Sequence, residues 1–148
     1  MVRLPHSLYN DIPASALNSR YRLVVASPLS GWSVATRQSD GRVFVLLQGH
    51  PEYGRLTLLK EYRRDVRRFF AGTQSLHPAI PLDYLDADGV ELLESFRSTC
   101  ESRPNAPVDG FPYEEAAEHV PFGWEQSSQR LFSNWIVDAA TRCALVGS

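Results

Sequence analysis

Short runs of apolar residues in the first third of the chain predict β-strands. Residues 21–26 (YRLVVA) and 32–37 (WSVATR) are rich in β-branched and aromatic side chains. After a hairpin turn at residues 39–41 (SDG), residues 42–48 (RVFVLLQ) give the strongest strand prediction. Because the centre of this segment, VFVLL, is apolar at every position, we expect it to be a central strand buried on both faces.

Beyond residue 55 the apolar residues recur at helical spacing, which predicts helices over residues 56–70, 89–101 and 127–145. Thr57 is a candidate cap for the first helix. The first helix is expected to bury one apolar face, formed by Leu56, Leu59, Tyr62, Val66 and Phe69. The last helix is expected to make apolar contacts through Leu131, Trp135 and residues 137–140.

This order of elements suits the closing portion of an α/β domain with a mixed sheet. A chain of 148 residues fits one compact domain or part of a larger one. Three strands are few for an independent sheet, which usually has about 4–6. We therefore expect the sheet to lack partners on one side.

Composition narrows the function classes. A net charge of −2 gives no electrostatic reason to expect a nucleic-acid partner. Cys100 and Cys143 stand apart from each other and from metal-ligand spacing, so we expect no metal site. They fit a reducing compartment, and no apolar run approaches the roughly 20 residues that span a bilayer. We expect a cytoplasmic protein with no membrane contact.

His50 and Glu52 are the first candidates for chemistry. They follow directly on the apolar strand, and the carboxyl ends of strands carry functional groups in α/β folds. An imidazole beside a carboxylate is a general-base arrangement, because the carboxylate fixes the tautomer and stabilises the imidazolium. Alternation in an extended segment would place both residues on one side. A surface histidine that merely contacts a nearby acid is the commoner arrangement, and the residues alone leave both readings open.

Other polar groups carry weaker signals. Arg63 and Arg64 lie in the first predicted helix, where a charged solvated face is the simpler reading and a guanidinium fork for a carboxylate is the functional one. Ser7 and its neighbour His6 fall in an N-terminal loop, where a hydroxyl is most often a turn or cap group.

Taken together, five segments resemble the homoserine O-acyltransferase (homoserine O-succinyltransferase) family, and they occur in that family's order. The resemblance covers nearly the whole chain but only about the C-terminal half of the family's length. The segments are residues 4–9 (LPHSLY), 49–53 (GHPEY), 55–58 (RLTL), 61–65 (EYRRD) and 131–135 (LFSNW).

The resemblance implies the C-terminal portion of a class I glutamine-amidotransferase-like (flavodoxin-like), three-layer α/β fold. It implies transfer of a succinyl or acetyl group from acyl-CoA, a co-substrate rather than a bound cofactor, to the hydroxyl group of homoserine in methionine biosynthesis. By position, His50 and Glu52 match the family's catalytic histidine and glutamate. Arg64 and Ser7 match its substrate-binding residues.

The sequence departs from the family in two ways. The family's nucleophilic cysteine lies upstream of the segment matched here, and neither Cys100 nor Cys143 matches it. We therefore expect a single partial domain over residues 1–148 that needs a cysteine-bearing partner chain or forms a homo-oligomer. A non-catalytic remnant or regulatory subunit that keeps the amino-acid pocket is the alternative. About residues 82–109 form an insertion relative to the family.

Overall fold

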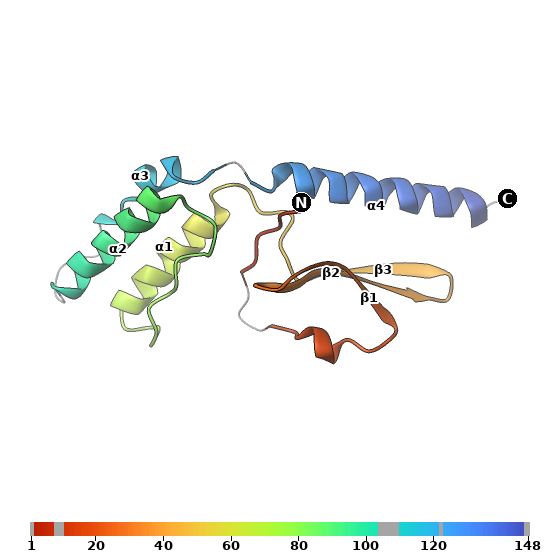
Figure 1. The fold of residues 1–148 in the computed structure, drawn as a ribbon, viewed down its shortest axis with the longest axis horizontal. Helices are drawn as coiled ribbons and strands as arrows, with labels where there is room; N and C mark the ends of the chain where they lie inside the picture. Colours follow the sequence, from red (N-terminus) through yellow and green to blue (C-terminus); the bar gives the residue numbers. More distant parts are fainter. Residues whose placement is uncertain (1, 8–10, 104–109, 122, 147–148) are drawn as a thin grey trace. The chain divides into compact units, whose positions relative to one another are not determined.

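The computed structural model describes residues 2–7, 11–103, 110–121 and 123–146. The chain divides into two compact units (Figure 1). Unit 1 comprises residues 1–53 and 123–148, and unit 2 comprises residues 54–122. The single partial domain expected from the sequence stays a prediction.

Unit 1 contains an antiparallel sheet of strands β1 (Tyr21–Ser27), β2 (Gly31–Ser39) and β3 (Arg42–Leu47), in the order β1-β2-β3 (Figure 1). The predicted strands are confirmed, and the chain is a mixed α/β protein. The mixed sheet expected from the sequence is wrong for these three strands, because both pairings are antiparallel. Asp40 and Gly41 have φ angles of 52° and 73°, the left-handed conformation that a tight two-residue hairpin requires.

The central strand is β2, so the prediction that residues 42–48 form a central, doubly buried strand is wrong. On β2, Val34 and Ala35 are exposed by only 1% and 0%, although their side chains point to opposite faces. On the edge strand β3, Phe44 and Leu47 remain 50% and 40% exposed. An apolar run shows that a strand can be buried on both faces. Whether it is buried depends on its position in the pairing order of the strands.

Unit 1 also contains the short 3-10 helix η1 (Ala14–Ala16) and the helix α4 (Glu125–Val146). The apolar contacts predicted for the second half of α4 are wrong in this structure. Trp135, Ile136 and Val137 are exposed by 45%, 66% and 65%, because few of the described residues of unit 1 pack along this part of the helix.

Unit 2 consists of helices α1 (Thr57–Phe70), α2 (Ala87–Glu101) and α3 (Tyr113–Glu118). The first and second confirm the predicted helices, whereas α3 arises from an acidic stretch that carried no helix prediction. The cap predicted at Thr57 is wrong, since Leu56 occupies that position without a side-chain cap. The buried residues of α1 are Leu58, Leu59, Tyr62 and Val66, so the expected apolar face is largely confirmed.

Two side chains join the segments of unit 2. The Tyr84 hydroxyl donates to the Arg55 carbonyl oxygen at 2.8 Å and accepts from the amide of Leu59 at 3.2 Å. The Arg55 guanidinium donates to the carbonyl oxygens of Ala117 and Val120, which end α3 and follow it. Helix α2 lies within the segment expected to be an insertion, and that expectation stays a prediction. Among the helices described, none has the length and apolar character to cross a membrane.

Candidate active site

The site begins where β3 leaves the sheet. The amides of Gln48 and Gly49 both donate to the Ser33 carbonyl oxygen on β2, at 2.9 and 3.2 Å. The chain then turns away at Pro51, which cannot donate to a further ladder bond. His50 therefore sits at the carboxyl end of an edge strand, directly beside the buried centre of the sheet.

His50 and Glu52 are in contact, as the sequence predicts. Nδ1 of the His50 ring lies 2.8 Å from Oε1 of Glu52. The contact forms across a turn, closed by a 3.2 Å hydrogen bond from the Tyr53 amide to the His50 carbonyl oxygen, rather than by strand alternation. The Tyr53 ring stacks on the His50 ring with centroids 4.4 Å apart and planes 22° from parallel. The turn and the stacked ring together restrict how the imidazole can rotate.

Both ring nitrogens of His50 face acceptor groups. A carboxylate can only accept, so Nδ1 donates its proton to Glu52. Nε2 lies 3.3 Å from the Ser7 carbonyl oxygen, a long contact that a ring proton can also fill. A neutral imidazole has only one N–H group, whereas an imidazolium has two. This arrangement therefore suits a histidine that receives a proton on Nε2 while Nδ1 stays bonded to Glu52.

The electrostatics of Glu52 agree with this role. Partial burial raises the pKa of its carboxyl group. Hydrogen bonds from the His50 ring and from its own backbone amide, together with the charge on His50, lower this pKa by more than burial raises it. The net pKa lies below the ordinary value, so Glu52 stays ionised at neutral pH. Its side chain is 60% exposed and that of His50 is 30% exposed, which leaves the pair reachable from solvent.

Trp124 is a part of the site that sequence reasoning missed. Its indole N–H donates to the Tyr53 carbonyl oxygen at 2.6 Å, and its side chain is buried. The bond anchors the end of the turn that contains His50 and Glu52. The two partners are 71 positions apart, and a lone tryptophan before a helix carries no sequence signal for such a contact.

Of the two predicted substrate-binding residues, Ser7 lies in unit 1 and Arg64 in unit 2. Ser7 presents its carbonyl oxygen to His50. The Arg64 guanidinium makes a two-pronged ion pair with Asp65, at 2.8 and 3.0 Å, and approaches Glu61 at 3.9 Å. Hydrogen bonding to Arg64 is the main reason that the pKa of Asp65 lies below its ordinary value. Substrate-binding roles for both residues stay predictions.

Arg63, the neighbour of Arg64, also has a side-chain partner. Its guanidinium carbon lies 4.3 Å from the centre of the Tyr113 ring, within the range of a cation–π contact. The two arginines therefore have different partners within unit 2, one a carboxylate and the other an aromatic face.

Neither cysteine is among the residues that contact His50 or Glu52 in the part of the chain described. Burial, followed by the charge of Glu101, raises the pKa of the Cys100 thiol, which disfavours the reactive thiolate. Cys143 is exposed on α4. Asn134 and Trp135, in the fifth segment of the family resemblance, are both exposed. Among the described residues, no cluster of three or more potential metal ligands is found.

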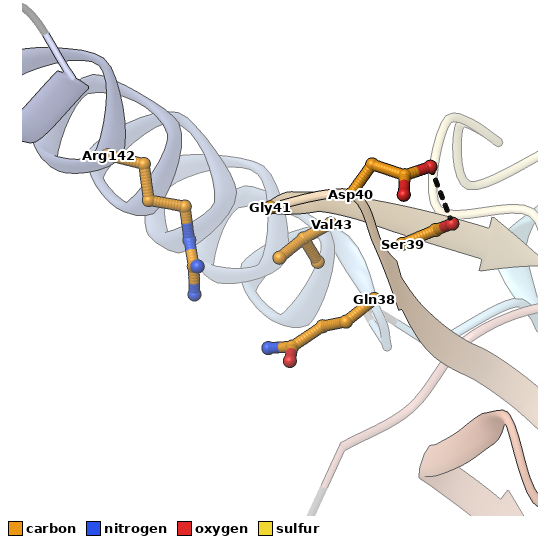
Figure 2. A pocket seen from close by; sticks show the side chains of 6 residues that line it. All are labelled: Gln38, Ser39, Asp40, Gly41, Val43 and Arg142. Atoms are coloured by element: carbon orange, nitrogen blue, oxygen red, sulfur yellow. Dashed lines mark hydrogen bonds between the residues drawn. The ribbon is translucent and has the colours of Figure 1, made fainter.

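A small open pocket of ≈ 240 Å³ lies elsewhere in unit 1, between the β2–β3 hairpin and α4 (Figure 2). In Figure 2 the only side-chain hydrogen bond joins Ser39 to Asp40 within the hairpin. No candidate catalytic residue lines it. The lining residues are Gln38, Ser39, Asp40, Gly41, Val43 and Arg142.

The fold and this dyad define a mixed α/β protein with a candidate histidine–glutamate acid–base pair at a strand end. The sequence model of the family described as homoserine O-succinyltransferase matches residues 1–142, and the chain belongs to this family.

Curated relatives carry the same description. The chain is 36% identical over 142 residues to a homoserine O-succinyltransferase of Rhodopseudomonas palustris, covering 95% of this chain and 42% of the relative. It is 37% identical over 146 residues to that of Methylorubrum extorquens, covering 97% of this chain and 44% of the relative. The chain thus spans less than half the length of these relatives. No solved structure matches it.

Proposed function

We propose that this chain supplies the histidine–glutamate part of a homoserine O-acyltransferase. The observation that carries the proposal is the 2.8 Å contact between Nδ1 of His50 and Glu52 at a strand end, in a chain of this family. The contact leaves Nε2 as the ring atom that can exchange a proton with a reacting group.

In the first half-reaction, Nε2 of His50 accepts the proton of a cysteine thiol that lies outside this chain. The thiolate attacks the thioester carbonyl carbon of the acyl-CoA co-substrate, and a new thioester forms. The bond to the coenzyme A sulfur breaks, and that sulfur leaves with the proton held by His50. The ionised Glu52 stabilises the imidazolium between these two proton transfers.

In the second half-reaction, His50 accepts the proton of the homoserine hydroxyl group as its oxygen attacks the enzyme thioester. An ester forms, the bond to the cysteine sulfur breaks, and the proton on His50 returns to that sulfur. Electrons and protons balance over the two steps, so the chemistry needs no resident cofactor. Succinyl and acetyl donors both fit this scheme.

Arg64 would hold the α-carboxylate of homoserine, because a guanidinium offers a carboxylate two parallel hydrogen bonds. It already makes this geometry with Asp65, at 2.8 and 3.0 Å. Ser7 would contact the amino acid from the segment beside His50. A glutamine-amidotransferase-like fold, a cytoplasmic location and a cysteine-bearing partner chain or homo-oligomer are parts of the same proposal.

The test is complementation. The chain is mixed with a polypeptide made of the part of the Rhodopseudomonas relative that it does not match, and thiol release from succinyl-CoA is followed with homoserine present. We expect turnover from the mixture, none from either part alone, and loss of turnover with His50→Ala. Binding of homoserine without turnover in a well-formed complex would instead support the alternative, a binding or regulatory subunit that has lost the reaction.

A further inference from the structure

Two segments that are far apart in the sequence frame the His50 ring. The His50 amide donates to the Pro5 carbonyl oxygen at 2.8 Å, and Nε2 of its ring lies 3.3 Å from the Ser7 carbonyl oxygen. The position of the imidazole therefore depends on residues 5–7 as well as on its own strand. What holds residues 5–7 in place then matters to the dyad.

His6 lies between these two contacts and faces the sheet. Its Nε2 is 2.6 Å from the hydroxyl oxygen of Ser33, which is only 5% exposed on β2. The carbonyl oxygen of the same Ser33 accepts from the amides of Gln48 and Gly49. The side chain of Ser33 thus bonds to His6, and the backbone of Ser33 bonds to the two residues that precede His50.

The His6 ring also packs closely against the backbone at Gly49. A β-carbon built on Gly49 would lie 3.3 Å from Nε2 of His6, 3.3 Å from the β-carbon of Ser33 and 3.4 Å from that of Leu4. These distances are tighter than ordinary side-chain contacts, so the His6 ring lies directly on the backbone that precedes His50. A displacement of the ring would open this contact.

The surroundings keep His6 neutral. Burial is the main cause that lowers its pKa, and the charge on His50 lowers it further, while Asp11 opposes both. Its Nδ1 is buried and finds no hydrogen-bond partner among the described residues. A neutral ring has one N–H donor and one acceptor nitrogen, so Nε2 either donates to the Ser33 hydroxyl oxygen or accepts from the hydroxyl group, according to the tautomer.

We propose that His6 is a positioning residue, whose ring holds residues 5–7 on Ser33 and thereby keeps His50 directed at Glu52. It touches no reacting atom and acts only through His50. The catalytic consequence rests on the proposed acyltransferase function, whereas the geometric claim does not.

The test compares two variants of the full chain that differ in reach. Glutamine can place a polar atom where Nε2 of His6 lies, and asparagine cannot, so His6→Gln should keep the bond to Ser33 and His6→Asn should lose it. Nuclear magnetic resonance follows the His50 ring proton that is bonded to Glu52, which Glu52→Ala identifies because it removes the acceptor and so shifts the resonance of this proton. We expect its exchange with water to quicken about fivefold or more in His6→Asn and to change less than about twofold in His6→Gln.

Ser33→Ala removes the hydroxyl group that His6 bonds to, so it should quicken the exchange as His6→Asn does. If one of these two variants does not fold, the other still tests the proposal. Equal exchange in the Gln and Asn variants, or an unchanged ring proton in Ser33→Ala, would overturn the proposal. In the complemented protein, His6→Asn should lower kcat more than it raises KM for homoserine. If the wild-type mixture shows no turnover, the acyltransferase proposal fails, and the ring proton still decides the role of His6.

Discussion

A side chain at Gly49 would press closely on His6. A β-carbon at that position would lie 3.3 Å from Nε2 of the His6 ring, and also 3.3 Å from the β-carbon of Ser33. Ser33 is part of the buried centre of β2, so it cannot easily move away. The backbone just before His50 is therefore pressed against the segment that carries Ser7.

Gly49→Ala should destabilise unit 1 by roughly 1–3 kcal/mol, the usual cost of inserting a methyl group into a packed region. Chemical denaturation followed by circular dichroism measures the change. Gly54→Ala is the matched control, since a β-carbon there meets only Oγ1 of Thr57 at 3.8 Å, an ordinary contact. We expect the control to stay within about 1 kcal/mol of the wild type. Equal losses in the two variants would contradict the close packing at Gly49.

The stability of the chain should fall on mild acidification because of His6. Its pKa in the folded chain lies below the ordinary histidine value, so the unfolded chain binds more protons as the pH drops. The contribution is fully present above about pH 6.5, the unperturbed value, and is lost as the pH falls through the folded pKa. His6→Gln, which cannot titrate, should flatten this part of the profile of denaturation midpoint against pH. An identical slope in wild type and variant would show that His6 does not titrate differently in the folded chain.

Arg64→Lys should weaken homoserine binding in the complemented protein by roughly 1.5–3 kcal/mol, the range for a hydrogen bond to a charged group. Arg63 is a poor control, because its guanidinium lies over the Tyr113 ring. Arg67 is exposed on the same helix, and Arg67→Lys should stay within about 0.5 kcal/mol. Isothermal titration calorimetry measures both. Equal effects would mean that Arg64 belongs only to the charged face of α1.

The exposed side chains of β1 and β3 should promote association of two copies of the chain. Leu23 pairs with Ala35 and Phe44 pairs with Arg37, so both project to the same face of the sheet, where they are 42% and 50% exposed. Light scattering over a concentration series should show association that Leu23→Ser with Phe44→Ser reduces. Leu29→Ser changes an isolated leucine at the β1–β2 turn and should have no effect. A monomer at every concentration would refute this prediction.

The sequence predicted what local patterns determine. Strands, helices and the contact of His50 with Glu52 all arise within a few residues of one another, and all are present. The edge position of β3 was missed because pairing order is a property of the whole sheet. The bond from His6 to Ser33 spans 27 positions and that from Trp124 to Tyr53 spans 71, and no periodicity encodes either.

The candidate site was predictable only to the same extent, because local patterns do not encode contacts between distant segments. The short motif after a strand left two readings of His50 open, and only the family resemblance made it a catalytic candidate. Its supporting groups come from other segments, and they are a serine hydroxyl, a backbone carbonyl and an indole, which occur in every protein without special roles. Only their arrangement near the His50 ring sets them apart, and that arrangement requires the folded chain.

Trp124, which anchors the turn, also makes the unfolding of unit 1 visible in tryptophan fluorescence. All three tryptophans, Trp32, Trp124 and Trp135, belong to unit 1, and residues 54–122 contain none. Trp32 and Trp124 are buried and donate to carbonyl oxygens, so their fluorescence should shift when unit 1 opens. Far-ultraviolet circular dichroism also registers the three helices of unit 2. Where the two signals change at different denaturant concentrations, the two units melt separately, and where they coincide the chain unfolds as one cooperative body.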